Sequence, residues 1–190
     1  MKNYLSAEQF AAALHGMEAC DGACKWAEGL DYNTAWNTCY NPGWMFFLIE
    51  KIIPLTLVVN ELLVCRFARE VVYLTADSRV LACIEVREAW ARGKATDEER
   101  VAALAAAWAA AQIDTDSAAS DAASDAACSA TWDAARDAAR SAAYAASAIA
   151  AAFVTGPDEE WDAVYDAAAK NARAKQCDII RELVAQPELV

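Results

Sequence analysis

Residues 120–144 read SDAASDAACSATWDAARDAARSAAY, and this stretch decides the fold of the chain. Alanine fills about half of residues 101–153, and it has the highest helix propensity of the common residues. The larger side chains recur every fourth position, in one series from Ser120 to Tyr144 and in a second from Asp121 to Ser141. Four residues advance a helix by about 400°, so each series drifts by about 40° per repeat and winds around the helix. The repeat therefore predicts either helix breaks, near residues 114–115 and Thr131, or close contact with neighbouring helices on several sides.

A turn and a second long helix follow the alanine-rich stretch. Residues 155–158, Thr-Gly-Pro-Asp, combine glycine and proline in a way that is typical of a turn. A last helix is expected from there to about Val184, with Trp161, Ile179 and Leu183 facing inward. Two long helices joined by a short turn predict an antiparallel helical hairpin over residues 113–190.

The first half of the chain carries the start and stop signals of several shorter helices. Ser6 with Gln9 and Thr96 with Glu99 form capping-box patterns, and Pro42 suits a first helical position. Six Gly and four Pro are too few for the turns of a β-sandwich, and no run alternates at period two. Helices are expected over residues 6–16, 17–28, 33–39 (capped by Asn33 or Thr34), 42–51, 54–73, 75–91 (capped by Thr75 or Asp77) and 96–112.

These patterns together predict an all-α fold. We expect one domain, residues 1–190, in which residues 1–112 form a compact multi-helix bundle and residues 113–190 a long alanine-rich antiparallel hairpin. Alanine buries little area, so the core volume has to come from the aromatic and Leu, Ile and Val side chains of the first half.

The charge of −12 is unevenly distributed, because residues 101–135 contain no Lys or Arg. Such a surface repels phosphates, so direct binding of nucleic acid is disfavoured. The aspartates of the repeat predict an acidic face that binds a basic protein surface; the plainer alternative is that they only keep an alanine-rich protein soluble. The face consists of Asp121, Asp125, Asp133 and Asp137.

The sequence favours a cytoplasmic location. Residues 1–14 show no secretory signal, and no apolar run reaches the roughly 20 residues that cross a bilayer, so no membrane partner is expected. Seven cysteines scattered over predicted helices are expected to be reduced and mostly buried.

Catalytic and metal-binding patterns are scarce. His15 is the single histidine, and no phosphate-binding loop, nucleophile elbow or zinc-protease motif occurs. Cys20, Cys24 and Cys39 with His15 make a conceivable zinc ligand set, but their spacing is not a zinc-finger pattern. We therefore expect no enzyme activity, no metal and no cofactor, and interpret these thiols as buried.

Aromatic residues and arginines carry the prediction of a small-molecule site. Trp26, Trp36 and Trp44 lie in an aromatic-rich segment that suits stacking against a base, although filling the core is the favoured alternative. Arginines are the candidate phosphate ligands, with solvated helix faces as the default interpretation. The candidates are Arg66, Arg69, Arg136 and Arg140 foremost, with Arg87 and Arg173.

Several segments in order along the chain also match a known pattern. They include Ala35-Trp36-Asn37-Thr38-Cys39, Asn41-Pro42-Gly43-Trp44-Met45, Glu85-Val86-Arg87-Glu88-Ala89-Trp90-Ala91-Arg92-Gly93, and Gln176-Cys177-Asp178-Ile179-Ile180-Arg181. With these segments the chain resembles an alanine-rich helical family of phages and bacteria, the immunity proteins with an immunity-five-like domain. The resemblance implies neutralisation of a toxin by binding, or interference with host defence, and it assigns no role to any residue.

The leading functional hypothesis is a non-catalytic inhibitor that neutralises a toxin or host defence protein through the acidic helices. One alternative is a protein that sequesters a small nucleotide immune signal, and a second is an acidic mimic of nucleic acid. The alanine-rich faces also suit self-association into a homo-oligomer.

Overall fold

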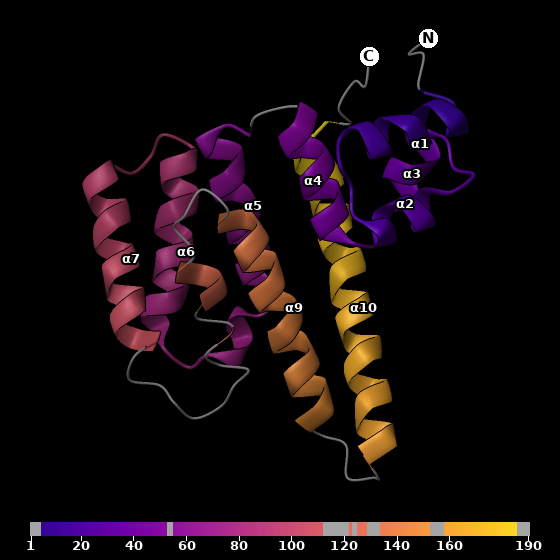
Figure 1. Ribbon diagram of the computed structural model, residues 1–190. Helices are drawn as coiled ribbons and strands as arrows, with labels where there is room; N and C mark the ends of the chain where they lie inside the picture. Colours follow the sequence, from indigo (N-terminus) through magenta and orange to yellow (C-terminus); the bar gives the residue numbers. More distant parts are fainter. Residues whose placement is uncertain are drawn as a thin grey trace.

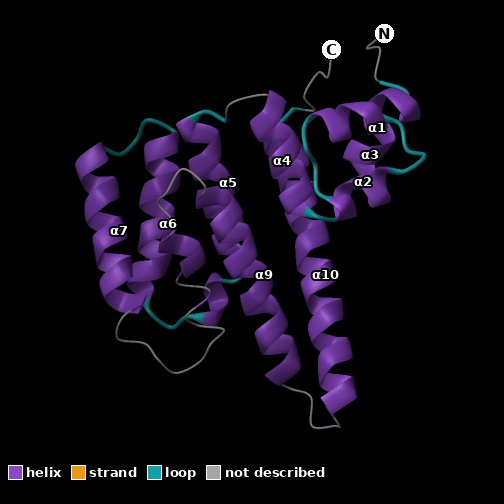
Figure 2. Cartoon of the chain, viewed as in Figure 1, coloured by secondary structure: helices purple, strands orange, loops and turns teal. Residues whose placement is uncertain are grey.

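The computed structural model describes residues 5–52, 55–111, 122, 125–128, 134–152 and 158–185. Within these ranges all regular structure is helical and no strand occurs, so the expected all-α fold is confirmed (Figures 1 and 2). The helices are α1 (Ala7–Gly16), α2 (Asp21–Ala27), α3 (Tyr32–Thr38), α4 (Pro42–Ile52), α5 (Leu57–Arg69), the 3-10 helix η1 (Val72–Leu74), α6 (Ser78–Ala91), α7 (Asp97–Ala111), α9 (Ala134–Ala152) and α10 (Asp158–Leu183).

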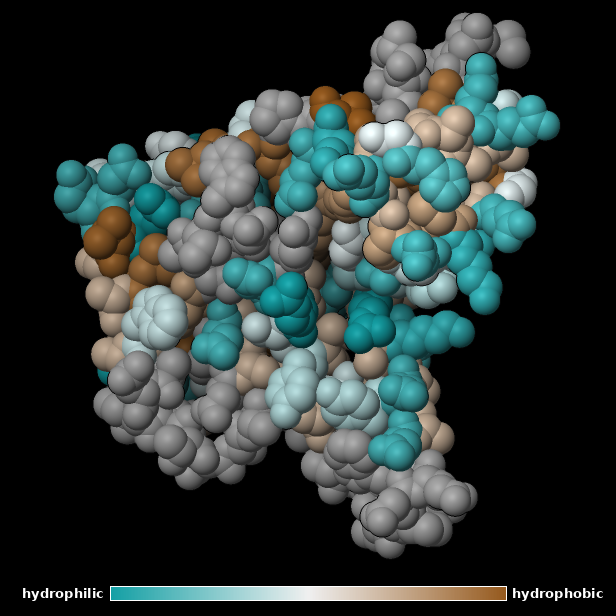
Figure 3. All heavy atoms as spheres, in the orientation of Figure 1, coloured by the Kyte–Doolittle hydropathy of each residue, from teal (hydrophilic) through white to brown (hydrophobic). Residues whose placement is uncertain are grey.

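The long helices lie side by side with α9 near the middle. Figure 1 shows α7, α6, α5, α9 and α10 following one another across the molecule, with α1–α3 gathered beside α4 and α10. Helices α9 and α10 run antiparallel and pack along each other, α9 also packs on α5, and α10 packs on both α4 and α5. One part of the hairpin is therefore built into the N-terminal bundle, whereas the end of α9 and the beginning of α10 extend beyond it (Figures 1 and 3).

The core combines bulky side chains from the N-terminal half with alanines from α9. Phe10, Tyr32, Met45 and Phe67 are among the largest fully buried side chains. Helix α9 contacts α4, α5 and α10 through buried alanines that span more than one of its faces, as the winding repeat predicts. These alanines are Ala138, Ala139, Ala142, Ala143 and Ala145.

Two predicted helix starts are confirmed in atomic detail. Ser6 and Gln9 form a capping box, with the Ser6 N–H donating to Gln9 Oε1 at 2.9 Å. Thr96 and Glu99 form the second, at 2.8 Å for the Thr96 N–H and 3.2 Å for the Glu99 N–H. Each box satisfies amide groups that the first turn of a helix leaves unpaired.

Three predicted boundaries are wrong, each for a local reason. Helix α2 begins at Asp21 and not at Met17, because the chain turns at Glu18, whose φ is +60°. Helix α3 is capped by Asp31 and not by Asn33 or Thr34, since the Asp31 carboxylate accepts from the Thr34 N–H at 2.9 Å. Helix α5 begins after Thr56, whose hydroxyl accepts from the Val59 N–H, and it ends at Arg69, before η1.

A buried cluster of charges joins α5, α6 and α7. The Arg87 Nε donates to Glu61 Oε2 at 2.5 Å, and the two side chains are only 1% and 4% exposed. Arg100 reaches Glu61 Oε1 at 2.9 Å and lies over the Trp90 ring. The Arg87 Nη1 also donates to the Ala127 carbonyl at 2.6 Å, so the cluster ties the alanine-rich segment to α6.

Some predictions lie outside the described residues. These are the helix breaks at residues 114–115 and Thr131, the turn at residues 155–157, and the side chain of Trp161. Within the described ranges, no helix combines the length and apolar character that crossing a membrane requires.

Candidate ligand-binding site

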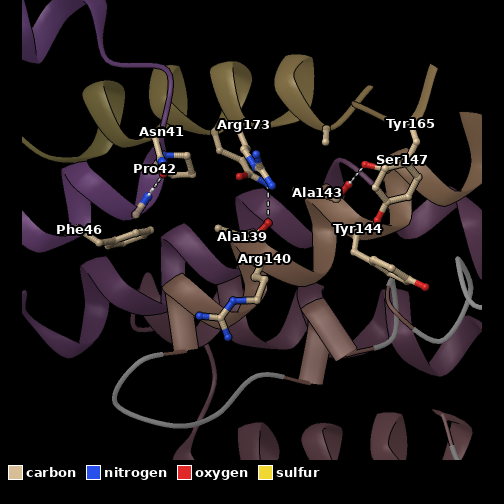
Figure 4. A pocket seen from close by; sticks show the side chains of 13 residues that line it. Asn41, Pro42, Phe46, Ala139, Arg140, Ala143, Tyr144, Ser147, Tyr165 and Arg173 are labelled. Carbon is tan, nitrogen blue, oxygen red and sulfur yellow. Dashed lines mark hydrogen bonds between the residues drawn. The ribbon is translucent and has the colours of Figure 1, made fainter. Parts of the chain in front are cut away.

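A cavity of about 420 Å³ opens between α4, α9 and α10. Its position follows from composition, because Ala139, Ala143 and Ala169 line it and leave space where larger side chains would close the gap between the helices. The polar and aromatic side chains that line it are Asn41, Phe46, Arg140, Tyr144, Ser147, Tyr165, Arg173 and Gln176 (Figure 4).

The loop before α4 forms one wall. Asn41 Oδ1 accepts a hydrogen bond from the Gly43 N–H at 3.0 Å, and Pro42 occupies the first position of α4 as predicted. This turn places Asn41, Pro42 and Phe46 together at one end of the cavity (Figure 4).

Two arginines supply positive charge from opposite helices. Arg173, on α10, is exposed and makes no ion pair with any residue that the structure describes. Arg140, on α9, is 74% exposed and pairs with Asp137 at 3.5 Å, an exposed contact that contributes little stability. Both guanidinium groups are therefore available to an anionic ligand, Arg140 by giving up a weak partner.

Aromatic rings lie at both ends of the cavity. Phe46 is at the α4 end, whereas Tyr144 and Tyr165 lie at the far end of α9 and α10 (Figure 4). The two tyrosine rings meet edge to face, with centroids 6.4 Å apart, and Tyr144 is exposed. Exposed ring faces of this kind suit stacking against a planar group.

Gln176 is the most informative residue of the cavity. Its side chain is 3% exposed, and its Nε2 donates to the Ala139 carbonyl at 2.7 Å. Only the amide nitrogen can donate to a carbonyl, so this bond fixes the orientation of the amide. Its Oε1 is buried and accepts no hydrogen bond from the described residues, a deficit that costs about 1–3 kcal/mol when nothing compensates it.

The three tryptophans predicted to form a stacking site do not line the cavity. Trp36 is buried in the core, in agreement with the alternative interpretation. Trp26 and Trp44 pack on each other and on Tyr40, with ring centroids 5.2–6.3 Å apart. They form a separate aromatic cluster at the junction of α2 and α4.

The predicted arginines are dispersed. Arg66 pairs with Glu182 at 2.7 Å, and Arg69 makes a two-pronged contact with Glu88 at 2.6 and 3.1 Å. Arg140 lines the cavity, together with Arg173 from the wider set, and the side chain of Arg136 lies outside the described residues.

The Arg69 contact leads to a prediction about pH. Hydrogen bonds from Arg69 hold the pKa of Glu88 below its ordinary 4.5. Because the pKa is lower in the folded protein, the contribution to stability is complete above pH 4.5 and is lost as the pH falls through the folded value. We expect Glu88→Gln to cost about 1 kcal/mol at neutral pH, a small value because Arg69 is partly exposed.

Urea unfolding of Glu88→Gln and of the wild type over a range of pH measures the contribution of the Glu88–Arg69 pair to stability. The difference between them should shrink as the pH falls through the folded pKa of Glu88, and a difference that stays constant in acid would contradict the assignment. Glu182→Gln, at the exposed pair with Arg66, is the control and should change stability less at every pH.

The predicted acidic face is not assembled in the described part of the chain. Asp125 is exposed, Asp137 pairs with Arg140, and both Asp121 and Asp133 lie outside the described residues. The acidic residues therefore remain a prediction from sequence.

The cysteines differ from one another more than the sequence predicts. Cys20 was expected to be buried on one helix with Cys24, but it is exposed at the N-cap of α2, because that helix begins later than predicted. Cys24 donates to the Ala19 carbonyl, and Cys39 lies in the core. In the described ranges, no three His, Cys, Asp or Glu side chains converge as metal ligands.

Sequence reasoning missed Gln176, Tyr144 and Tyr165 as functional candidates. Tyr144 and Tyr165 lie at similar distances before and after the predicted turn. The predicted antiparallel hairpin could therefore have indicated that these two rings meet. Comparison with known protein families, with curated proteins and with solved structures gave no match.

Proposed function

We propose that this protein binds and retains a small anionic molecule that carries a planar ring, of the nucleotide class, in the cavity between α4, α9 and α10. One observation carries the proposal: a single cavity combines Arg140 and Arg173 with aromatic rings and the unpaired buried acceptor of Gln176. Its volume of about 420 Å³ falls in the range of small-molecule sites.

Each group in the cavity suits one part of such a ligand. Arg173 and Arg140 present guanidinium groups, which bind phosphate oxygens through paired N–H donors. Tyr144 and Tyr165 offer ring surfaces for a base. Gln176 Oε1 accepts an N–H, as a nucleobase amino or imino group provides, and Asn41 lies in the same cavity as a further polar partner.

The lining residues favour retention over turnover. The Ser147 hydroxyl, a possible nucleophile, donates to the Ala143 carbonyl at 2.7 Å, and among the described residues that line the cavity no carboxylate, imidazole, thiol or amine is present to take its proton. Sequestration of a nucleotide signal, the first alternative from the sequence, is therefore the function that this geometry supports best. Neutralisation of a toxin or defence protein through the acidic residues remains a prediction from the sequence resemblance.

Thermal unfolding in the presence of nucleotides tests the proposal. The panel contains mononucleotides, cyclic dinucleotides and ADP-ribose-type compounds. Ribose 5-phosphate, which lacks the planar base, and adenosine, which lacks the phosphate, are the controls. We expect a saturable rise in Tm for at least one nucleotide, since a ligand at about 100 times its Kd stabilises the folded state by about 2.7 kcal/mol. No rise with any nucleotide would refute the proposal.

A matched pair of variants locates the site. Arg173→Ala should weaken binding of that nucleotide by about tenfold or more, measured by titration calorimetry, because a charged hydrogen bond is lost. Arg66→Ala removes an exposed arginine that pairs with Glu182 away from the cavity, and it should leave the Kd unchanged. Equal affinities for Arg173→Ala and the wild type would place the ligand elsewhere.

A further inference from the structure

Two buried cysteines from distant parts of the chain meet next to the cavity. Cys39 follows α3 and is 5% exposed, whereas Cys177 lies on α10 and is fully buried. The two thiols lie within hydrogen-bonding reach of each other, and the Cys39 thiol also donates to the Asn41 carbonyl at 3.3 Å. Both thiols are free in the structure.

A second interaction holds the backbone of Cys39 against the same turn of α10. Arg181 lies one turn after Cys177 on the same face of the helix. Its Nε donates to the Trp36 carbonyl at 3.0 Å and its Nη2 to the Cys39 carbonyl at 2.5 Å. Asp178 binds the remaining Nη1 at 2.7 Å, so the guanidinium is fixed in place. The approach of the two sulfurs therefore follows from a built contact between the end of α3 and α10.

We propose that Cys39 and Cys177 form a reversible disulfide when the protein meets hydrogen peroxide. The Arg181 hydrogen bonds, which hold the end of α3 against the turn of α10 that carries Cys177, and the burial of both thiols there carry this inference. Peroxide is a molecule close to water in size, and Cys39 keeps a small exposed surface.

The chemistry assigns a role to each sulfur. Cys39 is the nucleophile because it keeps a small exposed surface whereas Cys177 is fully buried, and the hydrogen bond from Cys177 also lowers the pKa of Cys39. The same hydrogen bond and burial raise the pKa of Cys177, which therefore keeps its proton.

The step balances as a two-electron oxidation. The Cys39 thiolate attacks one peroxide oxygen, the O–O bond breaks, and Cys39 sulfenic acid and hydroxide are formed. The Cys177 sulfur then attacks the Cys39 sulfur, the S–O bond breaks, and the departing hydroxyl leaves as water with the Cys177 proton. Two thiols are oxidised to one disulfide, and peroxide is reduced to two molecules of water.

The other buried cysteines lack this arrangement. Burial raises the pKa of Cys65 and Cys128 to about 12 and that of Cys83 to about 11, so these thiols are poor nucleophiles. The bond between Cys39 and Cys177 would join two walls of the cavity, because Asn41 lies two residues after Cys39 and Gln176 directly precedes Cys177.

Peptide mapping of the full-length protein tests the proposal. The protein is treated with hydrogen peroxide, free thiols are blocked with N-ethylmaleimide after unfolding, and a digest made without reductant is analysed by mass spectrometry. The Cys20→Ser variant is used in parallel because it removes an exposed thiol, and serine is a good N-cap for α2. In this variant we expect free thiols to fall from six to four per chain, with one linked peptide that joins Cys39 to Cys177 and disappears on addition of dithiothreitol.

A second variant separates the two roles. In Cys177→Ser the sulfenic acid of Cys39 has no resolving thiol, so it should be trapped by dimedone or proceed to sulfinic acid. The proposal is overturned if both cysteines stay reduced at peroxide levels that oxidise Cys20 in the wild type. It is equally overturned if Cys39 links to Cys24 or Cys65 as often as to Cys177.

Discussion

Replacing Glu61 by leucine is expected to lower the free energy of unfolding by about 3–5 kcal/mol, the largest effect among these predictions. Leucine keeps most of the side-chain volume but leaves the Arg87 guanidinium, which is 1% exposed, without its carboxylate. Loss of the carboxylate from a buried ion pair is far more costly than loss of an ion pair at the surface. Arg100 loses the same partner, although it is exposed enough to reach water.

The effect is measured by urea unfolding, where the midpoint should fall while the slope m stays the same. Glu182→Leu is the matched control, because it removes the carboxylate of an exposed pair with Arg66 and should cost less than about 1 kcal/mol. In the double variant Glu61→Leu with Arg87→Leu, much of the lost stability should return, since the buried Arg87 guanidinium is removed together with its carboxylate. A single variant as stable as the wild type would show that Arg87 is solvated or paired elsewhere.

Replacing Ala138 by leucine should cost about 3 kcal/mol, which is the second largest expected effect. Ala138 is fully buried on α9, the helix that packs against α4, α5 and α10. Three added carbon atoms have no space there, so α9 has to move away from a neighbour or adopt a strained rotamer.

The control for Ala138→Leu makes the same change at an exposed position. Ala167→Leu lies on the solvent side of α10 and should change stability by only a few tenths of a kcal/mol, the difference in helix propensity. The Tm and the urea midpoint are measured for both variants, and both values should fall clearly only for Ala138→Leu. Equal stability of the two would mean that α9 is packed more loosely than its buried alanines indicate.

The residues of the candidate site were only partly predictable. Arg173 and Arg140 were among the candidate phosphate ligands, but so were Arg66 and Arg69, which pair with carboxylates on α10 and α6. The ion-pair partner of an exposed arginine depends on which helix face lies opposite, and the four-residue drift of α9 makes that face impossible to assign from spacing alone. Gln176 could not be predicted as a cavity residue, because its burial and its hydrogen bond to the Ala139 carbonyl depend on how α10 packs on α9.

What the sequence determined by itself is the helical character of the chain and several helix starts. Helix propensity and capping act within four residues, so Ser6 with Gln9 and Thr96 with Glu99 could be identified without the fold. The tertiary structure decided which side chains meet: Arg87 with Glu61, Cys39 with Cys177, and Arg140 with Arg173 around one cavity. These partners are far apart along the chain. Contact between the end of α3 and α10 brings the two cysteines together, and the packing of α9 on α10 brings the two arginines to one cavity.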